Sequence, residues 1–409
     1  MDLSYIRKWV MCMKKIGEKG FEKTRLLYLV FMSIYELADK LYGTIHMAFM
    51  RCIGLSLTQI SKIVSISEIL LAIFDFPTGA IADKIGRKRI AAYGFITMGI
   101  ALIVYANSSG FWMVLLTRCV WVLGVALLSG APSAWLVDKM ISEGVYDKKE
   151  EILPKISGVI QFFSIVASVI AFFVIEIDIK LPILLAGIFA LLAGVIALCV
   201  GKDNYGEIKD ENMFKSLFGL AKSFFKDKKL ILLAIRNVAK YIILVCFVLY
   251  WQIQVTEKVG LEEKYLSFLL AWYMLCLMFG SFNASYFIKK TSGFRTSIIG
   301  SALCIAGFVV ILVNKDIVFF TIGSSMIEYG FGVEQSATST WMCDFIKSEV
   351  RSTYSSIFST INAIFGFVII NLLGVLTEAF GLNSAWIIAI IVASIDIVML
   401  GVIASRCKK

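Results

Sequence analysis

The sequence predicts an all-α integral membrane protein with twelve transmembrane helices, arranged as two parallel-repeat six-helix bundles. Three observations lead to this fold class: the composition, the length of the apolar runs, and an internal repeat. Of the 409 residues, 59% are hydrophobic and 17% are charged, whereas soluble proteins have about 45–50% apolar and roughly 25% charged residues. The apolar runs are continuous and about 20 residues long, which suits membrane-spanning helices better than alternating barrel strands.

Twelve such runs are predicted as spans, and a long polar stretch at 202–230 separates six from six. The predicted spans are 26–50, 58–82, 90–107, 111–138, 155–177, 181–201, 231–256, 264–288, 296–313, 317–345, 354–377 and 384–404. The predicted division is therefore a tail (1–25), a first bundle (26–201), a linker (202–230), a second bundle (231–405) and a short tail (406–409).

The positive charges predict the orientation of these spans. With a cytoplasmic N-terminus, the inside segments contain about 30 of the Lys and Arg residues and the outside loops about 6. We therefore expect a multi-pass protein of the cell membrane with both termini in the cytoplasm. The net charge of +10 is explained by loops that face anionic lipid, and it does not require a nucleic-acid partner. Residues 1–25 contain no apolar core typical of a cleavable signal peptide.

Apolar residues recur at helical spacing within the linker, while lysines take its other faces. This pattern predicts an amphipathic helix on the inner leaflet, with a plain linker as the alternative. The apolar residues are Phe214, Leu217, Phe218, Ala221, Phe224 and Phe225.

The fourth and tenth spans share residues at identical spacings, with an offset of 206. These residues are Gly124, Ser133, Trp135 and Asp138 in one span and Gly330, Ser339, Trp341 and Asp344 in the other. Equivalent helices in two sets of six predict a parallel repeat.

A short hairpin joins the second and third spans and contains Gly79, Asp83, Gly86, Arg87 and Lys88. It resembles the loop between helices 2 and 3 of the major facilitator superfamily, whose signature is G-x-x-x-D-x-x-G-R-K. Together with segments 54–60 and 130–138, the hairpin is similar to a bacterial branch of efflux proteins. The resemblance implies a secondary transporter that works by alternating access.

The resemblance also implies a gate. In the family, the loop acid, its arginine and an acid at the inner end of span 4 form a charge relay that closes the cytoplasmic side. Here these residues are Asp83, Arg87 and Asp138, and Arg295 with Asp344 is a degraded counterpart in the second half. The alternative is that the cations only set topology. Two features depart from the family: Val122 replaces the span-4 glycine, and span 5 lacks the glycine–proline motif of proton–drug antiporters.

Ionisable residues near the middle of the spans are the candidate site. Glu36, Asp39 and Lys40 share one face of span 1, and each charge at that depth costs roughly 2.5–3.5 kcal/mol. They are expected to border a wet cavity or to pair with one another. If Glu36 and Lys40 neutralise each other, Asp39 is left over. We predict Asp39 as the coupling acid, Glu36 as the second choice and Arg118 as the counter-charge.

Further candidates lie mostly on spans 1, 4, 7 and 10, which line the central cavity in the family. They are Glu68, Trp121, Arg236, Lys240, Glu328 and Glu334. Trp121 is a candidate for stacking on a ligand, with packing as the alternative. Because both signs of charge are present, the solute is expected to be polar or zwitterionic.

The predicted function is proton-coupled export of a small organic solute. Proton-coupled import is the alternative, and a transport-inactive receptor or scaffold on the same fold is a third reading. No nucleophile–base set predicts an enzyme. One histidine and nine cysteines without a C-x-x-C pair predict no metal site, and no cofactor is expected beyond the proton gradient. The expected partners are the solute and the lipid bilayer, and the expected state is a monomer.

Overall fold

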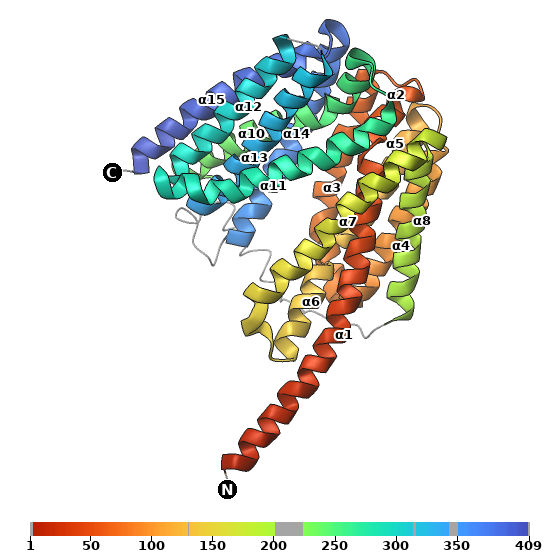
Figure 1. The fold of residues 1–409 in the computed structure, drawn as a ribbon, viewed down its shortest axis with the longest axis vertical. Coiled ribbons are helices and arrows are strands. Elements are labelled where there is room, and N and C mark those ends of the chain that lie inside the picture. The colour runs from red at the N-terminus through yellow and green to blue at the C-terminus, as the bar shows by residue number, and fades with distance from the viewer. Residues whose placement is uncertain (1–2, 130, 201–223, 314–315, 343–350, 408–409) are drawn as a thin grey trace. The chain divides into compact units, whose positions relative to one another are not determined.

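A computed structural model describes residues 3–129, 131–200, 224–313, 316–342 and 351–407 (Figure 1). Within these ranges every regular element is a helix. Most of the predicted linker helix, at 201–223, and Asp344 lie outside the described residues. Within the described helices, the side chains of Gly79 and Asp83 are also outside the description.

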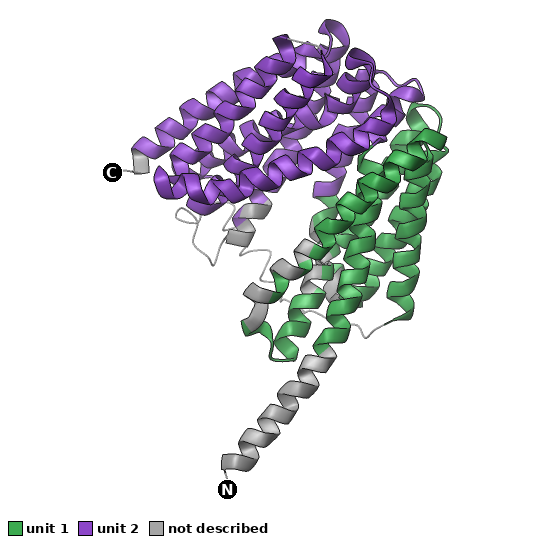
Figure 2. Ribbon diagram, in the orientation of Figure 1, with its two compact units in different colours: residues 1–44, 73–208 green, residues 45–72, 209–409 purple. Residues whose placement is uncertain are grey.

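The chain divides into two compact units, shown in Figure 2. Unit 1 comprises residues 1–44 and 73–208, and unit 2 comprises residues 45–72 and 209–409. The division falls inside α3 (Leu57–Ile85), so residues 45–72 pack with unit 2 although they belong to the first predicted bundle. The two units group residues by their contacts, whereas the predicted domains follow the internal repeat. The predicted domain boundaries therefore remain a prediction.

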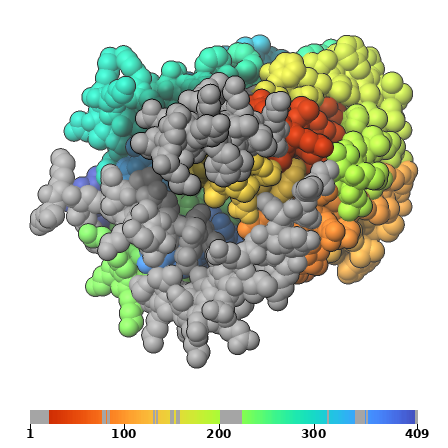
Figure 3. Space-filling view, turned by 90° about the horizontal axis from the view of Figure 1, so that it is seen from below, coloured from red at the N-terminus to blue at the C-terminus, as the bar shows by residue number. Residues whose placement is uncertain are grey.

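Unit 1 is built from α1 and the helices after the hairpin. Its elements are α1 (Leu3–Gly43), the second part of α3, α4 (Arg87–Ala106), α5 (Phe111–Leu128), α6 (Ala131–Ser142), a 3₁₀ turn η1 (Tyr146–Lys148), α7 (Lys149–Ile177) and α8 (Leu181–Cys199). α4 packs against α5 and α8, and α1 packs against α7 and α8. Figure 3 shows one end of this unit, where described parts of α1 (red), α4 (orange) and α8 (yellow-green) gather.

Unit 2 contains α2 and the first part of α3 together with all helices after the linker. Its elements are α2 (His46–Cys52), α10 (Lys228–Ile253), the π-helical turn η2 (Gln254–Val259), η3 (Glu263–Tyr265), α11 (Leu266–Lys290), α12 (Gly293–Val313), α13 (Ile317–Met342), α14 (Arg351–Phe380) and α15 (Asn383–Cys407). α13 packs against α11 and α12, and α15 packs against α10 and α12. Asp227 caps α10, since its carboxylate accepts from the Lys229 N–H at 2.8 Å.

Ten of the described helices are long and apolar enough to cross a membrane. α1 and α13, which correspond to predicted spans 1 and 10, do not meet that measure. α1 contains Glu36, Asp39 and Lys40, and α13 contains Glu328 and Glu334. The two predicted spans that do not meet this measure therefore carry much of the candidate site.

The predicted span 111–138 is not one helix. α5 ends at Leu128, Ser129 is extended with ψ 116°, and α6 begins at Ala131. Pro132 accounts for the break, because proline has no N–H to donate to the carbonyl four residues earlier, that of Leu128, and its ring clashes with that carbonyl.

Glycine contacts support the internal repeat. In unit 1, a Cβ on Gly94 would lie 2.9 Å from the Gly124 carbonyl oxygen, and in unit 2 a Cβ on Gly330 would lie 2.7 Å from the Gly300 carbonyl oxygen. The two pairs are related by the same offset of 206 that relates spans 4 and 10. Each allows two helix backbones to approach closely, as small residues do in membrane helices.

Candidate functional site

The charged trio of α1 is held together within unit 1. Lys40 Nζ lies 2.9 Å from Asp39 Oδ2 and 3.6 Å from Glu36 Oε1. Ser164 on α7 donates a hydrogen bond to Glu36 at 2.5 Å. The ion pair of Lys40 with Asp39 is shorter than that with Glu36, so Asp39 is not the unpaired carboxylate of the trio. Two carboxylates share one ammonium group, which leaves the trio with a net charge of −1.

Arg118 lies on α5 in an aromatic setting. Its side chain is buried, Nη1 donates to the Tyr42 hydroxyl, and the guanidinium carbon lies 4.3 Å from the centre of the Trp121 ring. Arg118 Nε has no hydrogen-bond partner, and no carboxylate among the described residues forms an ion pair with this side chain. The structure thus places Arg118 beside Trp121 but not in a direct pair with Asp39.

A cavity of about 200 Å³ lies in the same unit. Its lining comes from α1, α5, α6 and the break between α5 and α6: Met32, Tyr35, Val125, Leu128, Ser129 and Pro132. Tyr35 is four residues from Asp39, and Val125 is seven from Arg118, so the charged groups and the lining occur at helical spacing along the same two helices. The broken helix therefore contributes directly to the cavity wall.

The hairpin places two of its cations in specific contacts. Arg87 forms an ion pair with Asp138 on α6. Lys88 is buried and donates to the Val200 carbonyl oxygen at 2.9 Å. Gly86 precedes α4 with a φ of 113°, a conformation that side chains other than glycine rarely adopt. The structure joins Arg87 to Asp138 as the relay requires, and the Asp83 carboxylate lies outside the described side chains.

The counterpart in unit 2 is less complete. Arg295, near the start of α12, is exposed, and it has no ion pair among the described residues. Asp344 is not described, so the Arg295–Asp344 pair stays a prediction.

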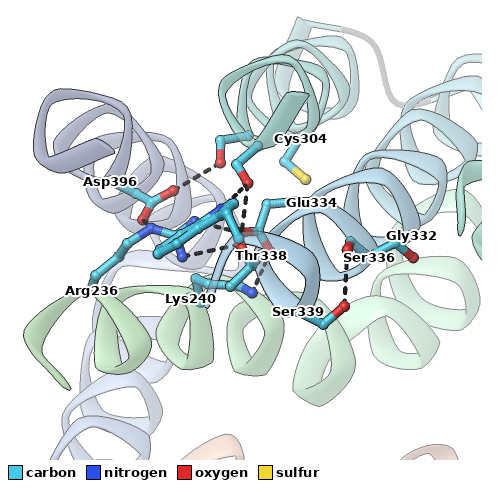
Figure 4. Close-up of polar contacts among 12 residues, drawn as sticks. Arg236, Lys240, Cys304, Gly332, Glu334, Ser336, Thr338, Ser339 and Asp396 are labelled. Carbon is cyan, nitrogen blue, oxygen red and sulfur yellow. Dashed lines mark hydrogen bonds and ion pairs between the residues drawn. The ribbon is translucent and has the colours of Figure 1, made fainter. Parts of the chain in front are cut away.

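Unit 2 contains a buried cluster of four charged groups, shown in Figure 4. Arg236 lies between two acids: it pairs with Glu334 on α13, and its Nε lies 3.1 Å from Asp396 Oδ1 on α15. Lys240, one turn from Arg236 on α10, also pairs with Glu334. Two cations and two carboxylates give a neutral cluster, which is the arrangement expected when charges are removed from water.

Hydroxyl groups complete this cluster. Thr338 donates to Glu334, and Ser301 on α12 donates to Asp396 at 2.8 Å. The Trp341 ring lies 5.3 Å from the Arg236 guanidinium carbon. Lys240 has the most exposed side chain of the four charged groups, at 22%.

Glu328 stands apart from the cluster on the same helix. Its side chain is buried, and it has no hydrogen bond or ion pair among the described residues. Tyr273 and Cys276 on α11 and Cys304 on α12 are the titratable groups close enough to interact with it electrostatically. Glu328 is thus a buried carboxyl group without a polar partner in the described part of the chain.

Residues 45–72 are attached to the rest of unit 2 by polar contacts. Gln252 Oε1 accepts from the N–H groups of Met47 and Ala48 at 3.1 and 3.3 Å. Arg51 pairs with Glu257 at 2.5 Å. Glu68, half-buried on α3, interacts with the Tyr241 phenol on α10, so it belongs to this region and not to the α1 trio.

Sequence reasoning omitted several residues that the structure places in these clusters. Asp396 lies on the last predicted span and was not among the predicted site residues, yet two cations one turn apart on α10 require two acids, and Glu334 supplies only one. Tyr42 follows Asp39 by three residues on the same helical face, which is the signal that could have identified it. Among the described residues, no three His, Cys, Asp or Glu side chains are arranged to hold a metal ion.

Long apolar helices, glycine-mediated helix pairs and buried charges within these helices define a polytopic membrane transporter. Comparison with known proteins agrees. The Major Facilitator Superfamily profile matches residues 26–370. The chain is 20% identical over 389 residues to the uncharacterized MFS-type transporter YxaM of Bacillus subtilis, covering 91% of this chain and 94% of the relative. This protein belongs to the major facilitator superfamily and is a secondary transporter, not an enzyme.

Solved structures share its fold at low sequence identity. A mutant of the nucleoside transporter NupG matches with a TM-score of 0.80 and 13% identity, covering 93% of this chain and 99% of that one. A POT family transporter in complex with 5-aminolevulinic acid matches with a TM-score of 0.69 and 14% identity, covering 95% and 96%. The predicted fold class is confirmed, and these neighbours establish the fold alone.

Proposed function

We propose that this protein couples the export of a small polar or zwitterionic organic solute to the proton gradient across the cell membrane. The observation that carries the proposal lies within unit 1, where Arg118 is without a carboxylate partner and the α1 trio has an excess carboxylate. A solute with both an anionic and a cationic group would satisfy both. The structural neighbour bound to 5-aminolevulinic acid, which has an amino and a carboxyl group, supports this solute class.

The trio also provides a reason for proton coupling. One added proton converts Glu36, Asp39 and Lys40 from a net charge of −1 to neutral, and this change depends on the charge of whatever occupies the site. Asp39 is the more exposed of the two carboxylates, at 34% against 20%. We therefore assign the coupling proton to Asp39, with Glu36 as the second choice.

The hairpin is proposed as the cytoplasmic gate. Arg87 and Asp138 would open and close with the passage, supported by Gly79, Asp83, Gly86 and Lys88. In the second half, Arg295 and Asp344 would have the corresponding role. With the hairpin on the cytoplasmic side, both termini would also lie in the cytoplasm. The proposed transport mechanism needs only one copy of the chain.

The test uses purified protein in lipid vesicles containing a pH-sensitive dye. Imposed solute gradients of amino acids and 5-aminolevulinic acid are the probes, and nucleosides are the neutral comparison. Antiport requires the solute and protons to move in opposite directions, whereas import by symport moves them together. Solute flux that moves no protons would refute the coupling. No flux with any probe, together with unchanged function of an Asp39→Asn variant in cells, would favour the receptor reading.

Asp39→Asn is the variant that tests the coupling acid. It should retain solute exchange and lose proton movement. Asp147→Asn, at an exposed position in η1, makes the same chemical change outside the trio and should behave as the parent. Equal proton movement in the Asp39→Asn variant and the parent would show that Asp39 is not the coupling acid.

A further inference from the structure

A second cavity lies in unit 2, and none of its lining residues is among those assigned to transport. It has a volume of about 200 Å³ and lies where η2 at the end of α10 meets the turn between α14 and α15. Its lining is Gln254, Lys258, Phe380, Gly381, Leu382 and Asn383. The charge distribution predicts that this end of the helices faces outside.

Gln254 is a buried polar group without a partner. Its side chain is only 2% exposed and lines the cavity, and Oε1 has no hydrogen bond. No other hydrogen bond from its amide is present in the described part of the chain. Leaving such a buried group unpaired is unfavourable. Either end of the amide can face the cavity, since oxygen and nitrogen positions are exchangeable by a flip.

The start of α15 supplies donors to the same cavity. Gly381 has a φ of 80°, and the turn that follows bonds the Ser384 and Ala385 N–H groups to the carbonyl oxygens of Gly381 and Leu382. The N–H groups of Leu382 and Asn383 have no such bond within the described residues. They begin a helix of 25 residues with no acidic side chain in its first turn. Free N–H groups at the positive end of a helix favour an anion.

Lys258 provides a full positive charge. Its side chain is exposed, and it forms no ion pair with another described residue. The acids nearest in sequence are already paired: Glu257 with Arg51 at 2.5 Å and Glu262 with Lys264 at 3.0 Å. The cavity therefore combines an available ammonium group, two backbone donors and an unsatisfied amide, with no acidic side chain in its lining.

We propose that this cavity binds the phosphate group of a ligand, either the headgroup of a lipid in the outer leaflet or a free phosphate anion. Phosphate oxygens accept from Lys258 and from the two N–H groups at the start of α15, and the Gln254 amide completes the coordination. Phe380 is 74% exposed at the edge of the cavity, where it would contact the glycerol backbone or acyl chain of a lipid. None of these residues is assigned to the proposed solute pathway.

Binding is tested with the purified full chain in phosphate-free detergent, by native mass spectrometry and thermal unfolding. The probes are phosphatidylglycerol, inorganic phosphate, and diacylglycerol, which lacks the phosphate. Lys258→Gln should weaken binding of the phosphate-containing probe by on the order of tenfold, the loss of one charge-assisted hydrogen bond. Lys264→Gln removes the same charge from a paired lysine and should bind as the parent.

A second variant keeps Lys258, the charged residue of the lining, unchanged. Asn383→Pro removes one N–H donor at the first helical position, where proline is tolerated, and should weaken binding to a similar extent. Saturation by inorganic phosphate alone identifies a free anion, and binding of phosphatidylglycerol only identifies a lipid. Diacylglycerol binding equal to phosphatidylglycerol, or equal binding by the Lys258→Gln and Lys264→Gln variants, would overturn the proposal.

Discussion

Arg236 on α10 donates to Glu334 on α13 with both side chains almost completely removed from solvent, at 2% and 5% exposed. Glu334 also neutralises Lys240 and accepts from Thr338. Glu328, six residues earlier on the same helix, is equally buried but has no partner in the described residues. Two buried acids of one helix thus differ in their surroundings: Glu334 is paired with cations, and among the described residues Glu328 is not.

This contrast predicts that the same substitution, Glu to Gln, lowers the free energy of unfolding by very different amounts at the two positions. Glu334→Gln leaves two cations without their shared carboxylate and should lower the free energy of unfolding by about 3–5 kcal/mol. Glu328→Gln removes no ion pair and should change it by less than about 1 kcal/mol. Thermal unfolding of the detergent-solubilised variants measures both. Similar losses in the two variants would mean that Glu328 has a polar partner of comparable strength.

The glycine pairs predict a second matched comparison. A Cβ on Gly300 would lie 2.6 Å from Glu334 Cβ and 2.7 Å from the Gly330 carbonyl oxygen, whereas nothing lies within 4 Å of a Cβ on Gly401. Gly300→Ala should therefore destabilise by about 1–3 kcal/mol through overpacking. Gly401→Ala, in the interior of α15, should stabilise by roughly 0.5–1 kcal/mol. Unfolding temperatures that fall for both, or for neither, would contradict this packing.

Membrane orientation is testable through two exposed cysteines. Cys52 ends α2 and Cys199 ends α8, and the charge distribution predicts that they lie on opposite sides of the membrane. In single-cysteine variants, a membrane-impermeant maleimide added to intact cells should label Cys52 and not Cys199. Permeabilised cells should give labelling of both. Labelling of Cys199 alone in intact cells would reverse the predicted topology.

The rate of Cys52 labelling should depend on pH. Although Cys52 is exposed, partial desolvation by its neighbours raises the pKa of its thiol, Glu263 and Glu257 raise it further, and Arg51 lowers it. Because the thiolate reacts and the thiol does not, labelling should be slow at neutral pH and accelerate at alkaline pH, above the range of an ordinary thiol. A rate that is already maximal at neutral pH would contradict a raised pKa for the Cys52 thiol.

The sequence predicted those features that follow from local pattern. The length of the apolar runs predicts the helices, the charge of the loops predicts their orientation, and the offset of 206 predicts the repeat. Helical spacing alone brings Glu36, Asp39 and Lys40 to one face. Contacts between distant elements were less accessible. Asp396 joins Arg236 across 160 positions, and Gln252 accepts from Met47 across a separation of 205. Such pairs depend on which helices pack together, which one sequence does not specify.

The role of Arg118 gives the last prediction. Its guanidinium stacks on Trp121 and donates to Tyr42, and a planar fork is needed for both contacts and for a bidentate bond to a carboxylate. Arg118→Lys keeps the charge but loses this geometry, so the apparent affinity for a zwitterionic solute should fall by about tenfold, and Arg118→Gln should abolish it. Arg25→Lys, at an exposed pair with Glu22, is the matched control, because surface pairs contribute little. The measurement is solute-driven proton movement in vesicles across a range of solute concentrations. A lysine variant with the parent's concentration dependence would show that Arg118 acts only as a charge, and a fully active glutamine variant would remove it from the solute site.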